Sequence, residues 1–507
     1  MIAILIIPLV TAALCYLFKN TKIVGYTSLA GSVILACIAV PSIIAAVFSP
    51  EGLTVGMLYL DALSGYIMAL VIFLGLASAV FSIGYMEHEL HAGLTDATGI
   101  RRYYALFHLF IFTMLLVTAA NNLALMWIAI EATTIVSAIL IGLGFTKRQL
   151  AIEAAWKYII LCTVGITFAL LGTFITYYAA TAVTGTVGEL NWTALRHIAD
   201  RLNPSTMKLA FIFILVGYGT KAGLAPVHNW LPDAHSEAPS PISALLSGIL
   251  LNTAFYGILR FVSIVEPSTG SIFTGNLLVV FGLISIGISS VFILVQDNYK
   301  RLLAYSSIEH MGIISFGIGI GGPLGAYGAL LHILNHAVSK PLMFFASGRI
   351  QSHYGSTRIE NVSGVMSSMP LLGTLAFIGA LSLSGAPPFN IFISEFTILK
   401  AGVDKGMWTV AGLFLFFAVI VFYGILSGFG RMLFGDPRLK AEVRETGDDV
   451  NAAEGDPGRR FRASRLHNTL SSVMMIFMAS IIVLLGLNVP DFIDHIIRAC
   501  INVMGIH

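Results

Sequence analysis

The sequence predicts an all-α polytopic membrane protein with about fourteen transmembrane helices, and two observations support this fold class. Of the 507 residues, 57% are hydrophobic and 11% are charged, whereas a typical soluble domain is about 25% charged. Apolar runs of 17 or more residues recur along the whole chain, and about 20 residues are needed to cross the hydrocarbon core of a bilayer. The candidate spans begin near residues 1, 24, 62, 104, 122, 156, 208, 240, 273, 302, 325, 370, 407 and 469.

These spans divide the chain into five segments in order. Residues 1–103 hold spans 1 to 3, residues 104–265 spans 4 to 8, residues 273–434 spans 9 to 13, residues 435–467 a hydrophilic loop, and residues 468–507 the last span and tail.

Loops on one predicted side hold 18 of the 28 lysine and arginine residues, and the opposite loops, in which we count Arg260, hold 7. Because basic loops stay in the cytoplasm, we expect the 435–467 loop there. Both termini then lie outside the cytoplasmic (inner) membrane of a bacterium or archaeon.

Residue patterns argue against redox or nucleotide chemistry in this chain. The four cysteines, at positions 15, 37, 162 and 500, have no C-x-x-C or ferredoxin spacing. The sequence also lacks a Walker loop, a dinucleotide fingerprint and an H-E-x-x-H motif. We therefore expect no cofactor, metal or catalytic residue in this chain and no nucleic-acid partner, and any energy for uphill transport comes from elsewhere.

Ionisable residues interrupt the predicted spans. They are Lys157, Lys221, Lys340, Glu131, Glu309, Glu395, His310, His332 and His336. A charge at mid-bilayer costs roughly 2.5–3.5 kcal/mol on insertion scales, and such residues usually mark proton or ion paths. A single pair would equally well hold two helices together. Charges distributed over six helices favour a path.

The histidines follow a helical spacing. His332, His336 and Lys340 are four residues apart, which places them on one helix face, and histidine titrates near neutral pH. A lone membrane histidine is more often a packing residue, but two stacked with a lysine favour a proton relay. Glu153 and Lys157 are one turn apart and form a candidate interfacial ion pair.

Spans 4 to 8 and 9 to 13 contain similar stretches in the same order. MWIAIEATTIVSAILIG around Glu131 matches AYSSIEHMGIISFGIG around Glu309, AAWKYII matches AVSKPLM, and GLAPVHN at 223–229 matches SGAPPFN at 384–390. The offsets are 178, 183 and 161 residues. Two successive units of five helices must have opposite membrane orientation, so we expect an inverted repeat.

Each unit has one helix interrupted by proline, near Pro226 in the first and near Pro387 and Pro388 in the second. A break leaves backbone groups that water or protein must cover. Water at the first break would lower the cost of a charge on Lys221, 13 residues into its span. The alternative is a kink that only shapes the bundle. We expect the Lys221 ammonium to lie within salt-bridge or single-water reach of Glu131.

Six stretches resemble the antiporter-like subunits shared by respiratory complex I, Mrp-type sodium/proton antiporters and energy-converting hydrogenases. They are NNLALMWIAIEATTIVSA, EAAWKYIILC, TKAGLAPVHNWLPDAHSEAPSP, KRLLAYSSIEHMG, LHILNHAVSKPLMF and LSLSGAPPFNIFISEF, and they span roughly residues 100–400. GYMEHEL, AIEATT, AWKYIIL, LLNTA and YSSIEHMG look most like the hydrogenase-4 component F group. Those proteins are membrane subunits of nickel–iron hydrogenase and formate hydrogenlyase complexes.

The resemblance implies roles for individual residues. Glu131 corresponds to the family's span-5 glutamate, and Lys221 to the broken-helix lysine on which it acts. Lys340 takes the position on the central axis, and Glu395 the position at its far end. Asn252 stands where similar complex I subunits have a lysine and cannot carry charge. The candidates to cover that gap are His228, Glu309, His310, His332 and His336.

The resemblance implies a proton-translocating or sodium-linked subunit of a redox-driven membrane complex, of the group 4 membrane-bound nickel–iron hydrogenase or formate hydrogenlyase kind. Its partners would be other membrane subunits, the lipid bilayer and a soluble arm that carries iron–sulfur clusters and a nickel–iron or quinone site. Three alternatives stay open. They are an Mrp-type cation/proton antiporter subunit, a bicarbonate-uptake membrane subunit and a non-conducting scaffold with vestigial ion pairs.

Overall fold

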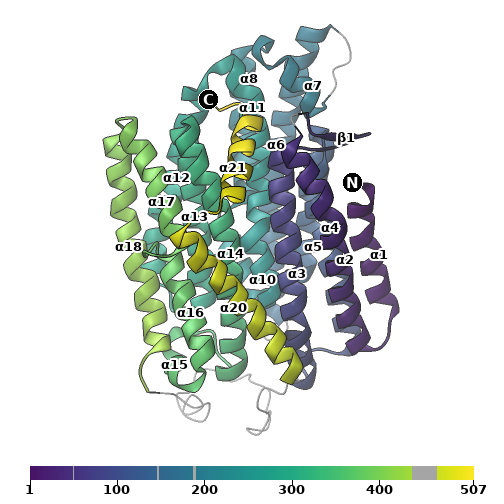
Figure 1. The fold of residues 1–507 in the computed structure, drawn as a ribbon, viewed down its shortest axis with the longest axis vertical. Helices are drawn as coiled ribbons and strands as arrows, with labels where there is room; N and C mark the ends of the chain where they lie inside the picture. The colour runs from purple at the N-terminus through teal and green to yellow at the C-terminus, as the bar shows by residue number, and fades with distance from the viewer. Residues whose placement is uncertain (50, 145–147, 186–189, 437–464, 507) are drawn as a thin grey trace.

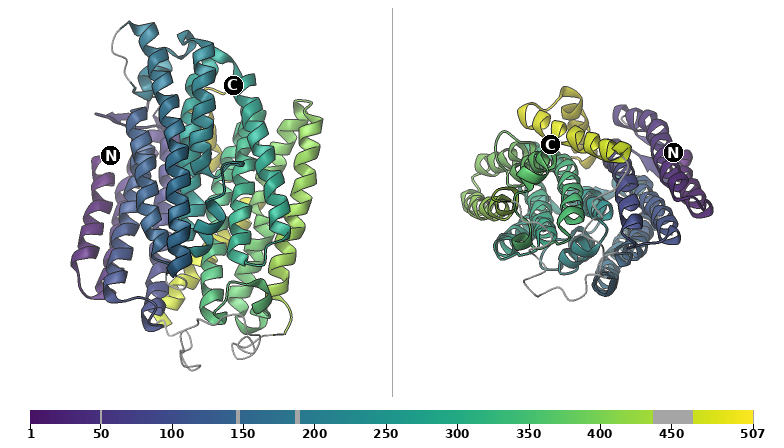
Figure 2. Two further views of the ribbon diagram at one scale, coloured as in Figure 1. Left: turned by 180° about the vertical axis from the view of Figure 1, so that it is seen from behind. Right: turned by 90° about the horizontal axis from the view of Figure 1, so that it is seen from below.

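Long apolar helices run side by side through most of the molecule (Figures 1 and 2). The computed structural model describes residues 1–49, 51–144, 148–185, 190–436 and 465–506. Within this part of the chain, nine helices are long and apolar enough to cross a membrane, and two shorter helices are also apolar. The chain is therefore a multi-pass helical membrane protein. A helix begins near each of the fourteen expected positions, but the number of fourteen spans stays a prediction.

Four helices make up the N-terminal part of the bundle, and the first two of them lie at its edge (Figure 2). They are α1 (Ile2–Leu17), α2 (Thr21–Phe48), α3 (Ala62–His91) and α4 (Ala97–Ala119). The all-α expectation has one small exception, because strands β1 (Leu53–Val55) and β2 (Leu58–Leu60) form an antiparallel hairpin between α2 and α3. Asp61 follows β2 and caps α3, since its side chain accepts from the backbone N–H of Ser64.

The next helices contain the first predicted break. They are α5 (Leu123–Gly142), α6 (Arg148–Thr184), α7 (Trp192–His197), α8 (Pro204–Ala222), α9 (Leu231–Glu237), α10 (Ser240–Leu245) and α11 (Leu251–Thr269). Helix α8 ends at Gly223, whose φ of 76° is left-handed, and α9 begins only after Pro226. A second interruption was not expected: residues Leu246–Leu250 form a π-helical turn between α10 and α11.

The following helices contain the second predicted break. They are α12 (Ser271–Leu294), α13 (Tyr299–Ile320), α14 (Gly322–Tyr354), α15 (Val365–Ser368), α16 (Pro370–Leu383), α17 (Asn390–Asp404) and α18 (Trp408–Leu433). Residues 384–389, which include Pro387 and Pro388, separate α16 from α17. Both expected helix interruptions are therefore present in the structure.

The C-terminal part crosses the bundle obliquely. Helix α20 (Arg465–Leu487) slants across the front in Figure 1 and leads into α21 (Asp491–Met504). Helix α21 was not expected, and it lies against α3, where the Cys500 thiol donates to the Ala62 carbonyl at 3.4 Å. Most of the predicted loop at 435–467 lies outside the described residues, so its placement stays a prediction.

Burial separates the centre of the bundle from its lipid-facing rim. The best apolar window of Ser240–Thr269 is 100% buried, whereas that of Trp408–Leu433 is 28% buried. Large exposed side chains such as Trp156, Phe174 and Phe416 lie on the outer helices α6 and α18. The ionisable residues described next lie mainly on or beside the buried central helices.

Candidate functional site

Lys221 occupies the last turn of α8, directly before the first helix break, and is fully buried. Its position suits a cation, because the carbonyl end of a helix carries partial negative charge. The ammonium donates to the Thr134 hydroxyl at 2.9 Å and to the Tyr158 hydroxyl. It also lies 4.6 Å from the centroid of the Tyr158 ring. This lysine is held by neutral oxygens and an aromatic face.

Glu131 on α5 lies on the other side of Thr134. The Thr134 hydroxyl donates to Glu131 Oε2 at 3.2 Å, and the Thr163 hydroxyl of α6 donates to Oε1 at 2.8 Å. Among the described residues Lys221 and Glu131 form no direct ion pair. Instead of the expected salt bridge or single water, the Thr134 hydroxyl connects the two groups. It accepts a hydrogen bond from the ammonium and donates one to the carboxylate.

Lys157 lies apart from this buried pair. Its side chain is 49% exposed and forms ion pairs with Glu153 at 2.7 Å and with Asp233 of α9 at 3.3 Å. The expected pairing with Glu153 is therefore present. Tyr158, the next residue, is the one that faces Lys221, because successive residues point about 100° apart around a helix. The structure thus places Lys157 on the outer face of α6, not in the buried row.

At the first break, nearby residues form hydrogen bonds with several of the backbone groups that the end of α8 leaves without helical partners. Gly223 donates to the Thr220 carbonyl at 3.2 Å and Leu224 to the Gly219 carbonyl at 2.9 Å, which closes the end of α8. The Trp230 indole donates to the Thr220 carbonyl at 2.8 Å. His228 within the break is 6% exposed, and its Nδ1 has no hydrogen-bond partner in the described part of the chain.

His235 on α9 was missed in the sequence analysis, which considered only histidines inside the predicted spans. It is fully buried, and neither ring nitrogen has a partner within the described ranges. Its ring lies 6.2 Å from that of Trp230 and 5.9 Å from that of Phe344 on α14. Trp230 in turn lies 4.7 Å from Tyr158. His235 therefore stands between the surroundings of Lys221 and the helix that carries Lys340.

Asn252 follows the π-helical turn that opens α11. Its amide donates to the Gly248 carbonyl at 2.8 Å, and its Oδ1 has no partner among the residues described. The same turn reaches α13 through a hydrogen bond of 2.7 Å between the hydroxyls of Ser247 and Ser307. Mid-helix π turns often accompany functional positions, and this one leaves a polar oxygen free where related subunits are expected to have a charge.

Lys340 on α14 is fully buried in the second unit. Its ammonium donates to the Leu303 carbonyl at 2.9 Å and to the Ser306 hydroxyl, both on α13. One turn away, His336 is fully buried, and neither of its ring nitrogens has a partner in the described ranges. Lys340, like Lys221, is therefore held by neutral oxygens.

The remaining predicted residues meet where α13, α14 and α17 converge. His310 Nδ1 lies 3.1 Å from His332 Nε2, and His332 Nδ1 lies 2.9 Å from the Ser394 hydroxyl. The rings of His310 and His336 are 5.3 Å apart, and Glu309 Oε2 is 3.5 Å from His310 Nδ1. The expected histidine stripe therefore exists and contacts two further helices.

Glu395 completes this group from α17, one residue beyond Ser394 and on the far side of the second break. Its carboxylate, His310 and His332 place one ligand atom each within 4.8 Å of one another. Gly385 in the break has a φ of 71° and lies against the Glu395 carboxylate. The break thus brings backbone directly beside an acidic group.

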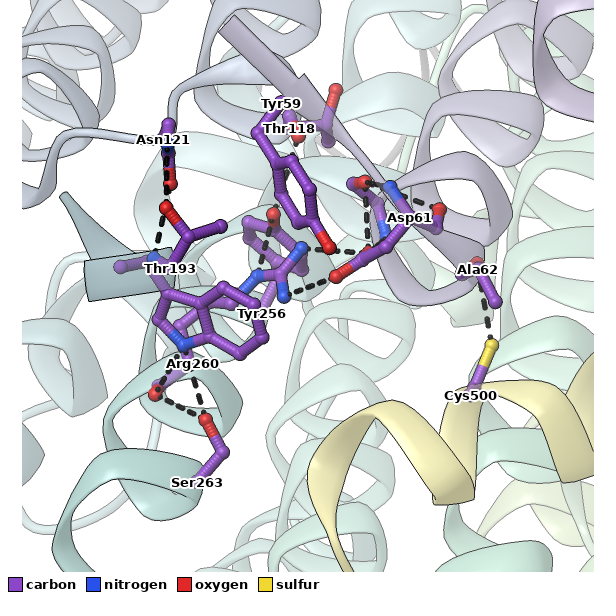
Figure 3. Close-up of polar contacts among 12 residues, drawn as sticks. Tyr59, Asp61, Ala62, Thr118, Asn121, Thr193, Tyr256, Arg260, Ser263 and Cys500 are labelled. Atoms are coloured by element: carbon purple, nitrogen blue, oxygen red, sulfur yellow. Dashed lines mark hydrogen bonds and ion pairs between the residues drawn. The ribbon is translucent and has the colours of Figure 1, made fainter. Parts of the chain in front are cut away.

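A separate buried ion pair joins Asp61 to Arg260 of α11 (Figure 3). The guanidinium binds both carboxylate oxygens, at 2.7 and 2.8 Å, donates to the Tyr256 hydroxyl at 2.8 Å and lies 4.3 Å from the centroid of the Trp192 ring. The expectation that Arg260 lies in a loop is wrong, because this residue lies within α11 although it is near the end of an apolar run. Since both charged groups are fully paired, this cluster fastens the β2–α3 junction to α11.

The buried row is chemically suited to moving protons. Hydroxyl groups and imidazole rings each donate and accept hydrogen bonds, and lysine, glutamate and histidine each gain and lose a proton. Several of these buried groups have an unbonded polar atom, and buried polar atoms without partners usually bind water.

Comparison with known proteins identifies the family. The family described as "NADH:quinone oxidoreductase/Mrp antiporter, TM" matches residues 120–421, and "NADH-Ubiquinone oxidoreductase (complex I), chain 5 N-terminus" matches residues 52–104. A hydrogenase-4 component F homolog of Methylacidiphilum infernorum is 40% identical over 75% of this chain and 79% of its own length. Hydrogenase-4 component B of Escherichia coli is 30% identical over 74% of this chain and 56% of its own length.

Solved structures share the fold. A chain of an archaeal membrane-bound sulfane sulfur reductase superposes with a TM-score of 0.83 at 23% identity, covering 99% of this chain and 97% of its own. A chain of the Mrp complex from Dietzia gives a TM-score of 0.80 at 20% identity, over 99% and 96% of the two chains. This protein therefore belongs to the NADH:quinone oxidoreductase/Mrp antiporter transmembrane family, which confirms the resemblance seen in its sequence.

Proposed function

We propose that this chain translocates protons, or sodium ions coupled to protons, as an antiporter-like membrane subunit of a larger redox-driven complex. The observation that carries this proposal is the bridge from Lys221 through Thr134 to Glu131. A buried lysine that needs charge compensation is linked to an acid through one group able to pass a proton. Lys340 and its histidines extend the same chemistry into the second unit.

Charge on Glu131 controls the first step of the proposed mechanism. An ionised Glu131 stabilises the Lys221 ammonium through the oriented Thr134 hydroxyl. When Glu131 is neutralised, the buried ammonium loses this compensation and releases its proton, because an isolated buried charge is costly. His235 lies in the direction of the second unit, and water must bridge to it because Trp230 and Phe344 carry no suitable relay group.

The second unit receives the proton at the histidine group. His310 and His332 share a hydrogen bond of 3.1 Å, so a proton can pass between their rings without movement of a helix. Ser394 continues the contact to α17, on which Glu395 follows. Glu395 is the terminal acid of this row and the only one of the three converging side chains that is not fully buried.

The similarity to hydrogenase-4 components supports a group 4 nickel–iron hydrogenase or formate hydrogenlyase type of complex. On this proposal, neighbouring membrane subunits and a soluble arm with iron–sulfur clusters and a nickel–iron or quinone site supply the energy. The chain would lie in the cytoplasmic membrane of a bacterium or archaeon with both termini outside. A subunit of an Mrp-type antiporter is the second candidate, because the Mrp complex shares the fold. Hydrogenase genes beside this gene would favour the first candidate, and a row of small membrane-subunit genes the second.

The decisive experiment replaces Glu131 with glutamine in the assembled complex and measures ion uptake into proteoliposomes. We expect Glu131→Gln to lower the pumping rate at least about tenfold, as for loss of one acid–base group, because it removes the charge without changing the volume. Glu153→Gln is the matched control, since Glu153 is an exposed acid whose one ion pair among the described residues is with Lys157, and Lys157 also binds Asp233. Pumping at the wild-type rate in Glu131→Gln would exclude this acid from the path.

A further inference from the structure

Three potential metal ligands from three different helices converge in the second unit. His310 belongs to α13, His332 to α14 and Glu395 to α17, and one ligand atom of each lies within 4.8 Å of the others. No metal was expected, since the sequence has no H-E-x-x-H motif and no metal-binding cysteine spacing, and these three residues are spread over positions 310 to 395. Folding, not spacing along the chain, brings them together.

The two ring nitrogens are separated by nearly the distance expected around a single ion. His310 Nδ1 and His332 Nε2 are 3.1 Å apart. Two nitrogens bound tetrahedrally to zinc at about 2.0–2.1 Å would lie roughly 3.3 Å apart. An ion could therefore take the place of the hydrogen bond once both rings turn so that their nitrogens face it.

The surroundings of the two rings support the same arrangement. His332 Nδ1 lies 2.9 Å from the Ser394 hydroxyl, which fixes the ring and leaves Nε2 to face His310. Glu309 is 2% exposed. Its Oε2 has no hydrogen-bond partner in the described part of the chain and lies 3.5 Å from His310 Nδ1. A buried carboxylate oxygen without a donor is costly, and a divalent cation here would satisfy it.

We propose that His310, His332 and Glu395 bind one divalent transition-metal ion of the zinc class, with the Glu309 carboxylate beside the site. Two imidazoles and a carboxylate favour zinc, cobalt or nickel over magnesium and calcium, which prefer all-oxygen sites. The ion would enter beside Glu395, the one of the three that is only partly buried.

Metal binding would also block ion transfer through the second unit. The bound ion occupies the nitrogen lone pairs that a proton needs when it passes between His310 and His332, so the metal and the transferred proton exclude each other. This inhibition rests on the proposed function, whereas the binding itself does not.

The binding test uses the purified complex that contains this chain, titrated with Co²⁺ by visible absorption and with Zn²⁺ by calorimetry. We expect one site that is lost, or weakened at least about tenfold, in His310→Gln, His332→Gln and Glu395→Gln. His108→Gln is the control, because His108 is an equally buried histidine on α4 that contacts Ser28 at 2.8 Å. Equal stoichiometry and affinity in the wild type and in His332→Gln would overturn the proposal.

The inhibition test adds Zn²⁺ to proteoliposomes that contain the wild-type complex and then removes it with a chelator. We expect reversible loss of pumping, with the inhibitory concentration raised about tenfold in Ser394→Ala, which keeps every ligand but frees the His332 ring. Full pumping at a zinc concentration that saturates the calorimetric site would overturn the inhibitory role. Metal binding as expected, together with normal pumping by Glu131→Gln, would instead refute the proposed function and leave the metal site intact.

Discussion

The two units of the bundle place the same kinds of charged groups in different surroundings. In the first unit, the Lys221 ammonium has two hydroxyl partners and an aromatic face, and both Glu131 oxygens accept hydrogen bonds. In the second, Glu309 Oε2 and both nitrogens of His336 lack hydrogen-bond partners among the described residues, although these groups are deeply buried.

This difference separates two tasks. A buried polar atom without a partner costs about 1–3 kcal/mol unless water satisfies it. We therefore infer that water reaches the histidine group of the second unit, whereas side chains saturate the Lys221–Glu131 pair of the first. Lys221 keeps its charge until Glu131 is neutralised, whereas a hydrated histidine group passes a proton on. The two units also differ in where the charged group stands relative to the helix break: Lys221 precedes the first break, and Glu395 follows the second.

Replacement of Lys221 is expected to reduce proton pumping more than any other substitution and therefore tests the comparison most severely. Lys221→Ala removes the charge that Glu131 compensates and should abolish translocation by the intact complex. Lys221→Arg keeps a cation but is effectively never deprotonated, so a lysine that must release its proton fails in this variant too. Proton uptake into vesicles driven by the complex measures both variants.

The arginine variant decides what the first unit does. Wild-type pumping by Lys221→Arg would show that the residue acts only as a fixed charge, and the division into a holding unit and a passing unit would be wrong. Purification of each variant complex with all its subunits is the control for assembly.

The second unit is tested most directly at Gly385. Its φ of 71° is left-handed, and an added Cβ would overlap the Glu395 carboxylate. Gly385→Ala should therefore displace Glu395 and reduce pumping several-fold, in addition to a backbone cost of about 1–2 kcal/mol. Gly406→Ala isolates the backbone cost, because Gly406 has a φ of 70° and open space at the Cβ position. Equal pumping by the two variants would show that the position of Glu395 does not matter.

The sequence was sufficient to predict features that depend on single residue types. Proline inside an apolar run predicted both breaks, and lysine deep inside an apolar run predicted the burial of Lys221 and Lys340. The structure added features that depend on packing between distant helices. Thr134 bridges Lys221 and Glu131 only because α5 lies beside the end of α8, and a threonine in an apolar helix carries no signal of its own.

The position of a residue within an apolar run does not report the direction of its side chain. It led to the wrong assignment of Arg260 to a loop, and it did not show that Lys157 faces outward. Helical rotation turns Lys157 outward to Glu153 and Asp233, and the carboxylate of Asp61 allows Arg260 to be buried. Knowledge of the helix neighbours would have been needed for both.

Asn252 lies between the two units and should have a moderate effect. Its amide makes one hydrogen bond, to the Gly248 carbonyl, and its Oδ1 has no partner in the described chain. One hydrogen bond is worth about 1 kcal/mol, or roughly a fivefold change, and water can replace the amide in Asn252→Ala. We therefore expect pumping to fall by no more than about fivefold. Complete loss in the proteoliposome assay would mean that this side chain, not water, connects the units.

Lys157 should have the smallest effect, and it tests whether the path is confined to the buried row. Lys157→Gln breaks two ion pairs of a half-exposed side chain, and such pairs are worth about 0–1 kcal/mol. Pumping should stay within about twofold of the wild type, as in the control Lys400→Gln, whose exposed lysine pairs with Asp404 one turn away. Tyr158 keeps its contact with Lys221 in this variant, since its side chain points about 100° away from that of Lys157 around α6. A loss as large as that of Lys221→Ala, with Lys400→Gln unaffected, would place the path on the outer face of α6 and remove the basis for comparing two buried units.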